Sequence, residues 1–283
     1  MSKKDQFVIA YLPCVEVVDS VMAHTVRLAT ILKKDIILLH IDDRRYRDTS
    51  INTDLLQRLQ GEINSRQDNP HASYCVLQQP TRKAIAAIGS LLNAVSVVAA
   101  VSNKASRHSA VHRREVLRNF SDCKTAYLTI QIESPSATTP RYERVAFSID
   151  YSKESKEKLL WASYFARFNN SRLELFHHTY RDEGLRQKWR NNVRFLDKFF
   201  SSLGVSYESH TLPYQRLLFP ETSVATAAAD SGCHLLISTT TDLRNKDLLD
   251  YLLGSAEQRT ICNPERMPVL YLNPRDDLYV LCD

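Results

Sequence analysis

The chain contains one pattern twice: short apolar segments alternate with amphipathic segments of helical period. In the first half, apolar segments occur at residues 7–12, 36–41, 95–101 and 126–130. In the second half, they occur at residues 145–149, 173–177, 235–237 and 268–272, and residues 205–211 alternate like a strand. Continuous apolar strands with helices between them are typical of a parallel sheet that is covered on both faces. We therefore predict an α/β fold made of two doubly wound parallel-sheet domains in tandem.

A segment rich in Ser, Thr and Pro, residues 133–140, separates the two halves and has no periodicity. This composition is typical of a linker. We predict a first domain at residues 1–134, a linker at 135–141 and a second domain at 142–283. In the second domain, an amphipathic helix is predicted to end before Gly204, because glycine is favoured just past a helix end.

The composition favours a globular protein of the cytoplasm. Hydrophobic residues make up 43% of the chain and charged residues 24%, which are ordinary globular values. No segment approaches the roughly 20 apolar residues that cross a bilayer, so a membrane is not an expected partner. The six cysteines are scattered, with neither a C-x-x-C pair nor zinc-ligand spacing to histidine, as suits a reducing compartment. We predict a soluble, cytoplasmic location.

Catalytic and metal-binding motifs are missing from the sequence. It has no G-x-S-x-G, H-E-x-x-H or G-K-[S/T], and the S-x-x-K match at Ser155 lacks its companion motifs. The adjacent His177 and His178 are predicted to point to opposite faces of one strand. A metal site there would need His210 or Asp150 to join them. We expect no catalytic residues, no metal site and no enzyme activity.

Polar residues follow two strands whose carboxyl ends border the point where the strand order of a doubly wound sheet reverses, which is where such sheets bind ligands. In the second half these residues are Asp150, Ser152 and the run at 238–241. A carboxylate facing hydroxyl groups could hold a ribose or a phosphate ester. Alternatively, Asp150 and Ser152 cap the helix that follows them.

Two stretches of the second half resemble a universal stress protein domain. Residues 145–155, a strand that ends at Asp150 followed by a polar turn and a helix, are similar to the opening of such a domain. Residues 252–272, which include Gly254 and Ser255, are similar to its closing helix and last strand. In the first half, the resemblance consists mainly of the strand order. It implies an internal pseudo-dimer, in which residues 126–130 lie beside 269–272.

The resemblance also implies an ATP site, which pairs the aspartate with a loop of the form G-x-x-G, nine residues, then G-[S/T]. Asp150, Gly254 and Ser255 match this pattern, whereas Thr241 and Arg244 stand where its first two glycines belong. In the first half, Leu12 replaces the aspartate. The whole chain has six glycines, and a phosphate loop needs glycine so that the backbone can approach the phosphates. The sequence therefore predicts lost or weak nucleotide binding.

We expect a stress-response binding or regulatory module without catalysis or a required cofactor, whose partner is an unidentified protein or small molecule. The alternative is a residual ATP site in the second domain, with the candidate residues Asp150, His178, Thr241, Arg244, Gly254 and Ser255. A third class of function, anion or nucleic-acid binding, would use the basic stretch at residues 104–114 together with Arg44, Arg45 and Arg47. That stretch contains no aromatic residue on which bases could stack, so nucleic acid is not an expected partner.

Overall fold

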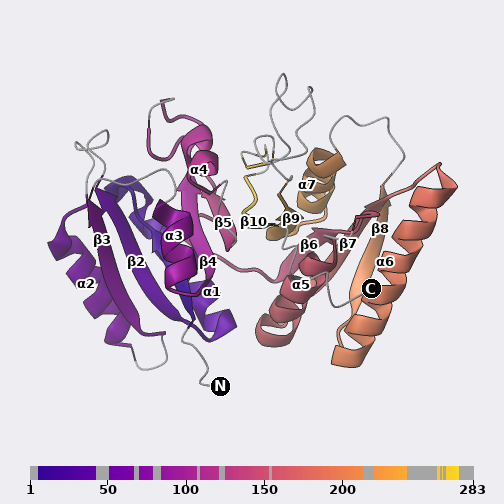
Figure 1. Ribbon diagram of the computed structural model, residues 1–283, viewed down its shortest axis with the longest axis horizontal. Coiled ribbons are helices and arrows are strands. Elements are labelled where there is room, and N and C mark those ends of the chain that lie inside the picture. The colour runs from indigo at the N-terminus through magenta and orange to yellow at the C-terminus, as the bar shows by residue number, and fades with distance from the viewer. Residues whose placement is uncertain are drawn as a thin grey trace. The chain divides into compact units, whose positions relative to one another are not determined.

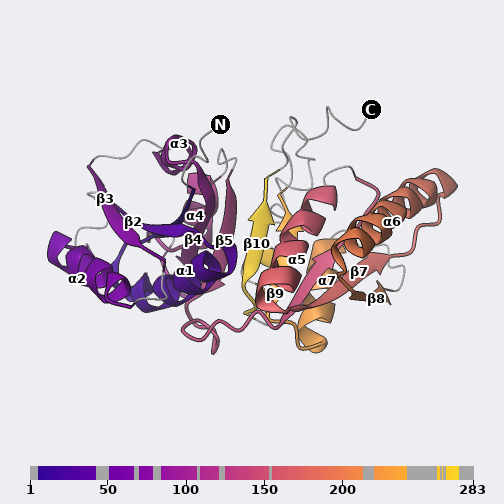
Figure 2. The same cartoon turned by 90° about the horizontal axis from the view of Figure 1, so that it is seen from below.

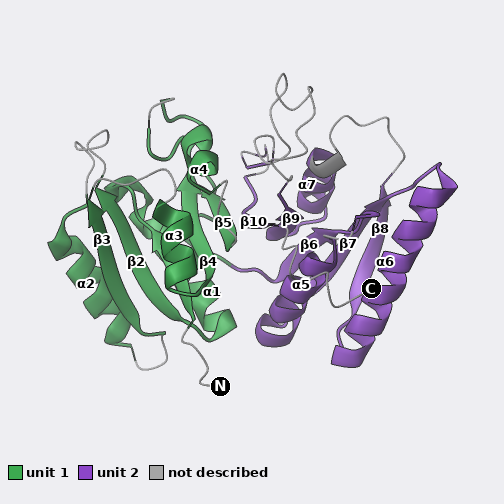
Figure 3. Cartoon of the chain, viewed as in Figure 1, with its two compact units in different colours: residues 1–140 green, residues 141–283 purple. Residues whose placement is uncertain are grey.

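The computed structural model of the chain (Figure 1) contains two compact units, Met1–Pro140 and Arg141–Asp283 (Figure 3). The residues that the structure describes are 6–42, 51–66, 70–78, 84–106, 109–120, 125–152, 155–212, 220–240, 260–261, 263 and 266–273.

Unit 1 is a five-stranded parallel sheet with helices on both faces. Its strand order is β3-β2-β1-β4-β5. The elements are β1 (Phe7–Tyr11), a short 3-10 turn (Val15–Val17), α1 (Val18–Leu32), β2 (Asp35–Asp42), α2 (Thr53–Asn64), β3 (Ala72–Gln78), α3 (Ala84–Leu91), β4 (Ala94–Val101), α4 (Arg113–Phe120) and β5 (Ala126–Gln131).

Unit 2 has the same strand arrangement, in the order β8-β7-β6-β9-β10. The elements are β6 (Arg144–Ser148), α5 (Ser155–Asn169), β7 (Arg172–His178), α6 (Glu183–Leu203), β8 (Tyr207–Leu212), α7 (Pro220–Asp230), β9 (Leu235–Thr239) and β10 (Val269–Leu272). The two doubly wound parallel sheets confirm the predicted fold class.

The direction of each crossover decides which face of the sheet a helix covers. The connection from β6 to β7 and the one from β7 to β8 move the same way along the sheet, whereas the chain then returns to β9 on the other side of β6. Because such crossovers are right-handed, α5 and α6 cover one face of unit 2 and α7 covers the other (Figure 2). Both faces of the central strands are therefore buried, which explains their continuous apolar sequences.

The strand β3 was not among the apolar segments of the first half, although the repeated pattern implied a strand at this position of the order. Most residues of β3 are half-buried or exposed, because this strand lies at the end of the sheet in unit 1. Its sequence, Ala-Ser-Tyr-Cys-Val-Leu-Gln, consequently lacks the apolar run that marks the central strands. The end of α6 agrees with the sequence: Gly204 follows it with φ of +65°, and its N–H bonds the carbonyls of Phe200 and Ser201.

The predicted linker is ordered where the structure describes it. Main-chain hydrogen bonds join Ala137 to Ser134 and Thr139 to Ser136 in successive turns, and Ala137 is buried. In unit 2, the Tyr142 ring packs edge-on against Phe165.

No described helix is long and apolar enough to cross a membrane.

Candidate functional site

The predicted ligand-binding edge of unit 2 begins at Asp150, directly after β6. Its Oδ1 accepts hydrogen bonds from the main-chain N–H of Ser152 and from the hydroxyl of Ser155, both at 2.7 Å. Ser155 is the first residue of α5, so the carboxylate holds the turn that leads from β6 into this helix. Neither bond comes from a main-chain N–H of α5, and both readings of Asp150 remain predictions.

A buried ammonium group lies beside this carboxylate. Lys158 on α5 is only 2% exposed, and its Nζ donates a hydrogen bond to the Ser148 hydroxyl at 3.1 Å. Burial by itself would raise the pKa of Asp150, but the charge of Lys158 and the hydrogen bonds from Ser152 and Ser155 outweigh it and lower that pKa below its usual value. The aspartate is therefore ionised, with a positive partner that the chain itself supplies.

A side chain of α6 also binds the turn after β6. The Asn192 side-chain amide donates to the carbonyls of Asp150, at 2.9 Å, and Ser152, at 2.8 Å. On the neighbouring strand, the Thr240 hydroxyl donates to Asn273 Oδ1 at 2.6 Å. Polar groups at both strand ends are thus engaged within the unit itself.

Of the six candidate nucleotide-site residues, the structure describes two. Asp150 lies at the carboxyl end of β6, and His178 ends β7, where its Nε2 and the Ser223 hydroxyl of α7 form a hydrogen bond of 3.2 Å. The other four lie outside the described residues: Thr241, Arg244, Gly254 and Ser255.

At the equivalent edge of unit 1, several of the described side chains are apolar and buried. Leu12, which takes the place of the aspartate, is fully buried, and its carbonyl accepts a hydrogen bond of 2.8 Å from His40 Nδ1. In the loop after β4, the Ser102 N–H bonds the carbonyl of Val111 at 3.0 Å, and Ala110 and Val111 are buried. Ala110 lies near the place where the resemblance would put the Gly-Ser pair of the first half, and its side chain is buried there.

The basic stretch of unit 1 is described only in part. Arg113 and Arg114 open α4, and Lys104 lies in the loop before it, where its N–H bonds the Ser102 hydroxyl at 3.1 Å. Arg44, Arg45, Arg47, Arg107 and His108 lie outside the described residues, so the anion-binding hypothesis for this stretch remains a prediction.

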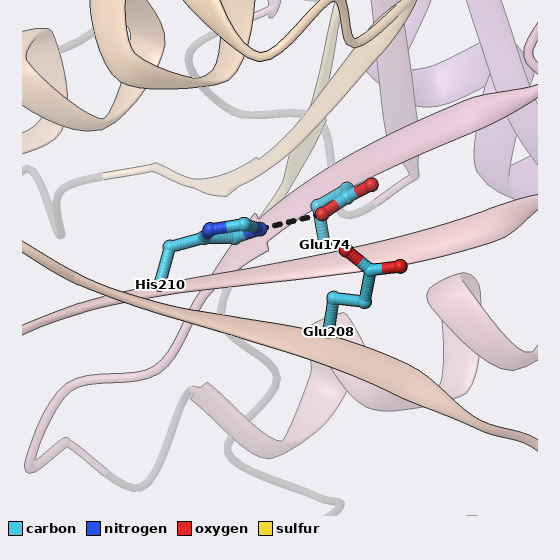
Figure 4. A group of neighbouring side chains, drawn as sticks. All are labelled: Glu174, Glu208 and His210. Carbon is cyan, nitrogen blue, oxygen red and sulfur yellow. Dashed lines mark hydrogen bonds and ion pairs between the residues drawn. The ribbon is translucent and has the colours of Figure 1, made fainter.

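A cluster of charged and polar side chains on β7 and β8, which was not predicted from the sequence, is centred on Glu174. Glu174 is 1% exposed, and its Oε1 accepts hydrogen bonds from Arg144 Nε at 3.0 Å and from the terminal nitrogen of the same guanidinium at 2.7 Å. Its Oε2 lies 2.6 Å from His210 Nε2 (Figure 4). Burial would raise the pKa of Glu174, but the contacts with His210 and Arg144 lower it. The available signal was the single charge inside the apolar segment 173–177.

The two adjacent histidines of β7 point to opposite faces, as predicted. The His177 ring packs against Trp189 of α6, with 4.8 Å between ring centroids, whereas His178 contacts α7. His210 bonds Glu174 rather than either of them.

Solved structures share this fold at low sequence identity. A universal stress protein from Archaeoglobus fulgidus has a TM-score of 0.68 and 13% identity, over 96% of this chain and 97% of its own. A protein described as a putative universal stress protein, from Pseudomonas aeruginosa, has a TM-score of 0.62 and 14% identity. The match covers 99% of this chain and 96% of that protein. The cytoplasmic domain of a prokaryotic cation chloride cotransporter has a TM-score of 0.55 and 14% identity over 95% of both chains.

No protein-family sequence model matches the chain, and no curated protein sequence matches it either. The structural matches show a fold of the universal stress protein kind, which confirms the fold that the resemblance implied. These matches cover nearly the whole chain, so the structural similarity includes residues of both units.

Proposed function

We propose that the chain is a stress-response binding or regulatory module of the universal stress protein kind, without catalytic activity and with lost or weak ATP binding. Its partner is an unidentified protein or small molecule, and it works in the cytoplasm. The observation that carries this proposal is that, where this fold offers a ligand site, the described part of unit 1 has buried apolar side chains and unit 2 has an aspartate bonded within its own turn.

In unit 1, the proposal is supported by the replacement of a carboxylate by Leu12 and by the burial of Ala110 and Val111. A nucleotide needs polar partners for its ribose and close backbone amides for its phosphates. Buried apolar side chains provide neither, because they exclude water and offer no donor. We infer that unit 1 has lost nucleotide binding.

In unit 2, the proposal is supported by the contacts of Asp150. Its Oδ1 bonds Ser152 and Ser155, and Lys158 supplies the compensating charge. A nucleotide would have to compete with these internal partners, whose local concentration is high because they belong to the same turn and helix. Binding there is therefore lost or weak.

The absence of catalysis is supported by the surroundings of Ser155, the serine of the S-x-x-K match. This side chain is 1% exposed, and its hydroxyl donates to Asp150. A nucleophile must contact the reacting carbon of its substrate, and a serine buried under a helix start cannot do so without unfolding of the turn.

A calorimetric titration of the full chain with ATP, ADP and AMP tests the proposal. We expect no binding tighter than a Kd of about 1 mM, which corresponds to about −4 kcal/mol. Micromolar binding of any of the three nucleotides would contradict it.

The alternative function, adenine-nucleotide binding in unit 2, is favoured by one observation: Asp150 lies at the carboxyl end of β6, next to the start of α5, and a helix start attracts phosphate. If this function holds, Asp150→Ala abolishes binding. The matched control is Asp182→Ala, because Asp182 is also an aspartate just before a helix of unit 2 and accepts a hydrogen bond of 2.8 Å from the Leu185 N–H of α6. Equal losses in both variants would point to general destabilisation instead of a nucleotide site.

A further inference from the structure

Three potential metal ligands gather on the two outermost strands of unit 2. Among the described residues, Glu174, Glu208 and His210 each offer one ligand atom, and these atoms all lie within 4.8 Å of one another (Figure 4). Glu174 on β7 is the register partner of Glu208 on β8. His210 lies two residues further along β8, and residues two apart on a strand share a face. The sheet register therefore places all three side chains on one face.

The cluster holds two carboxylates and one guanidinium, which acts electrostatically on both carboxylates but forms an ion pair only with Glu174. Two acidic side chains directly opposite each other on neighbouring strands repel each other. Arg144 compensates Glu174 by binding its Oε1. The Glu208 carboxylate forms neither a hydrogen bond nor a salt bridge with any residue in the part of the chain that the structure describes. A cation between the two carboxylates would remove this repulsion.

The contacts around the cluster hold two of the ligand atoms in place. Because Arg144 binds only Oε1, the Oε2 of Glu174 remains directed at His210 Nε2, 2.6 Å away. The His210 ring stacks on Phe176, with 4.8 Å between centroids and 21° between planes. Such outer contacts orient the ligands in metal sites. Glu208 is exposed and the His210 side chain is 34% exposed, so solvent reaches both residues.

We propose that Glu174, Glu208 and His210 bind one divalent transition-metal ion, with zinc as the best-suited member of this class. Zinc accepts histidine nitrogen and carboxylate oxygen at about 2.0–2.2 Å, and three protein ligands leave one position for water or an external donor. The ion would lie between Oε2 of Glu174 and Nε2 of His210, where it replaces the hydrogen bond that now joins these two atoms.

A bound ion would join the terminal strand β8 to β7 through side chains as well as through the main chain. Because β8 has a neighbour on one side only within unit 2, this link matters most there. The site is separate from the candidate nucleotide edge, because Glu174 lies near the amino end of β7 and Asp150 follows the carboxyl end of β6. The proposal therefore does not depend on the proposed function.

Zinc titration of the full chain at neutral pH, followed by calorimetry, tests the proposal, and Co²⁺ absorption reports the coordination. We expect one equivalent of metal per chain. Glu208→Gln and His210→Gln should each weaken binding by about 100-fold or more, which exceeds most effects of outer contacts. Glu208 is exposed, so its variant keeps the fold, which circular dichroism verifies. Glu62→Gln and His71→Gln in unit 1 are the matched controls and should bind zinc as the unaltered chain does.

Two further measurements sharpen the test. Zinc should raise the Tm of the unaltered chain and leave that of Glu208→Gln unchanged, since only a folded-state ligand stabilises. Affinity should fall as the pH is lowered, because protons compete with the metal for carboxylate oxygen and histidine nitrogen. The absence of zinc binding, or binding that persists in both Glu208→Gln and His210→Gln, would overturn the proposal.

Discussion

In unit 1, the imidazole of His24 on α1 donates a hydrogen bond from Nε2 to the main-chain carbonyl of Ser136, 3.2 Å away. His24 is fully buried, and burial lowers its pKa to about 4, although the bond to Ser136 opposes this change. The residue thus joins the first helix to the segment that was predicted to be a linker, and it does so as a neutral group.

This burial predicts a stability that depends on pH. The unfolded chain takes up a proton on His24 near pH 6.5, whereas the folded chain does so only near pH 4. Stability from this group is therefore complete above pH 6.5 and falls as the pH drops toward 4, by on the order of 3 kcal/mol. Urea unfolding at several pH values measures it. His24→Gln should flatten the slope and His71→Gln should not; equal slopes in His24→Gln and the unaltered chain would refute the prediction.

The ion pair between Arg144 and Glu174 predicts a large decrease in the free energy of unfolding when one partner is removed. Arg144→Met leaves the buried Glu174 carboxylate without its cation, and we expect a loss of about 3 kcal/mol in the free energy of unfolding. The double change Arg144→Met with Glu174→Leu should cost less than the single one, because it also removes the stranded charge. Urea unfolding of the unaltered chain, the single variant and the double variant measures these differences. A double variant less stable than Arg144→Met would contradict the prediction.

Two glycines with open space around them predict opposite effects of the same substitution. No atom lies within 4 Å of an added Cβ at either Gly61 or Gly204. Gly61 lies inside α2, so Gly61→Ala should stabilise the protein by about 1 kcal/mol. Gly204 has φ of +65° after α6, so Gly204→Ala should destabilise it by about 1 kcal/mol. Thermal unfolding of both variants gives the comparison, and shifts of the same sign would disprove the backbone explanation.

The Cys233 thiol is predicted to react slowly. Burial and the nearby Glu174 charge raise its pKa to about 12, and the thiolate is the reactive form. Cys75 is only half-buried. Brief alkylation of the folded chain at pH 8, read by peptide mass spectrometry, should label Cys75 well before Cys233, and urea should remove the difference. Equally fast labelling of both thiols in the folded chain would show that Cys233 is accessible.

Local sequence was sufficient for most of the fold. Apolar runs marked the central strands because both of their faces are buried, and the period of two along β7 correctly sent His177 and His178 to opposite faces. The helix end at Gly204 followed from the conformational freedom of that residue. The strand β3 was not placed, because a half-exposed strand needs no apolar run and so leaves no clear pattern.

The sites were less accessible to sequence reasoning. Both readings of Asp150 were consistent with its position after a strand, and the sequence did not show that its carboxylate bonds Ser152 and Ser155. The cluster of Glu174, Glu208 and His210 could not be found, because its members are up to 36 residues apart and meet only through the register of β7 and β8. Periodicity is a property of neighbouring residues and is visible in the sequence, whereas the pairing of distant strands depends on how the whole sheet assembles.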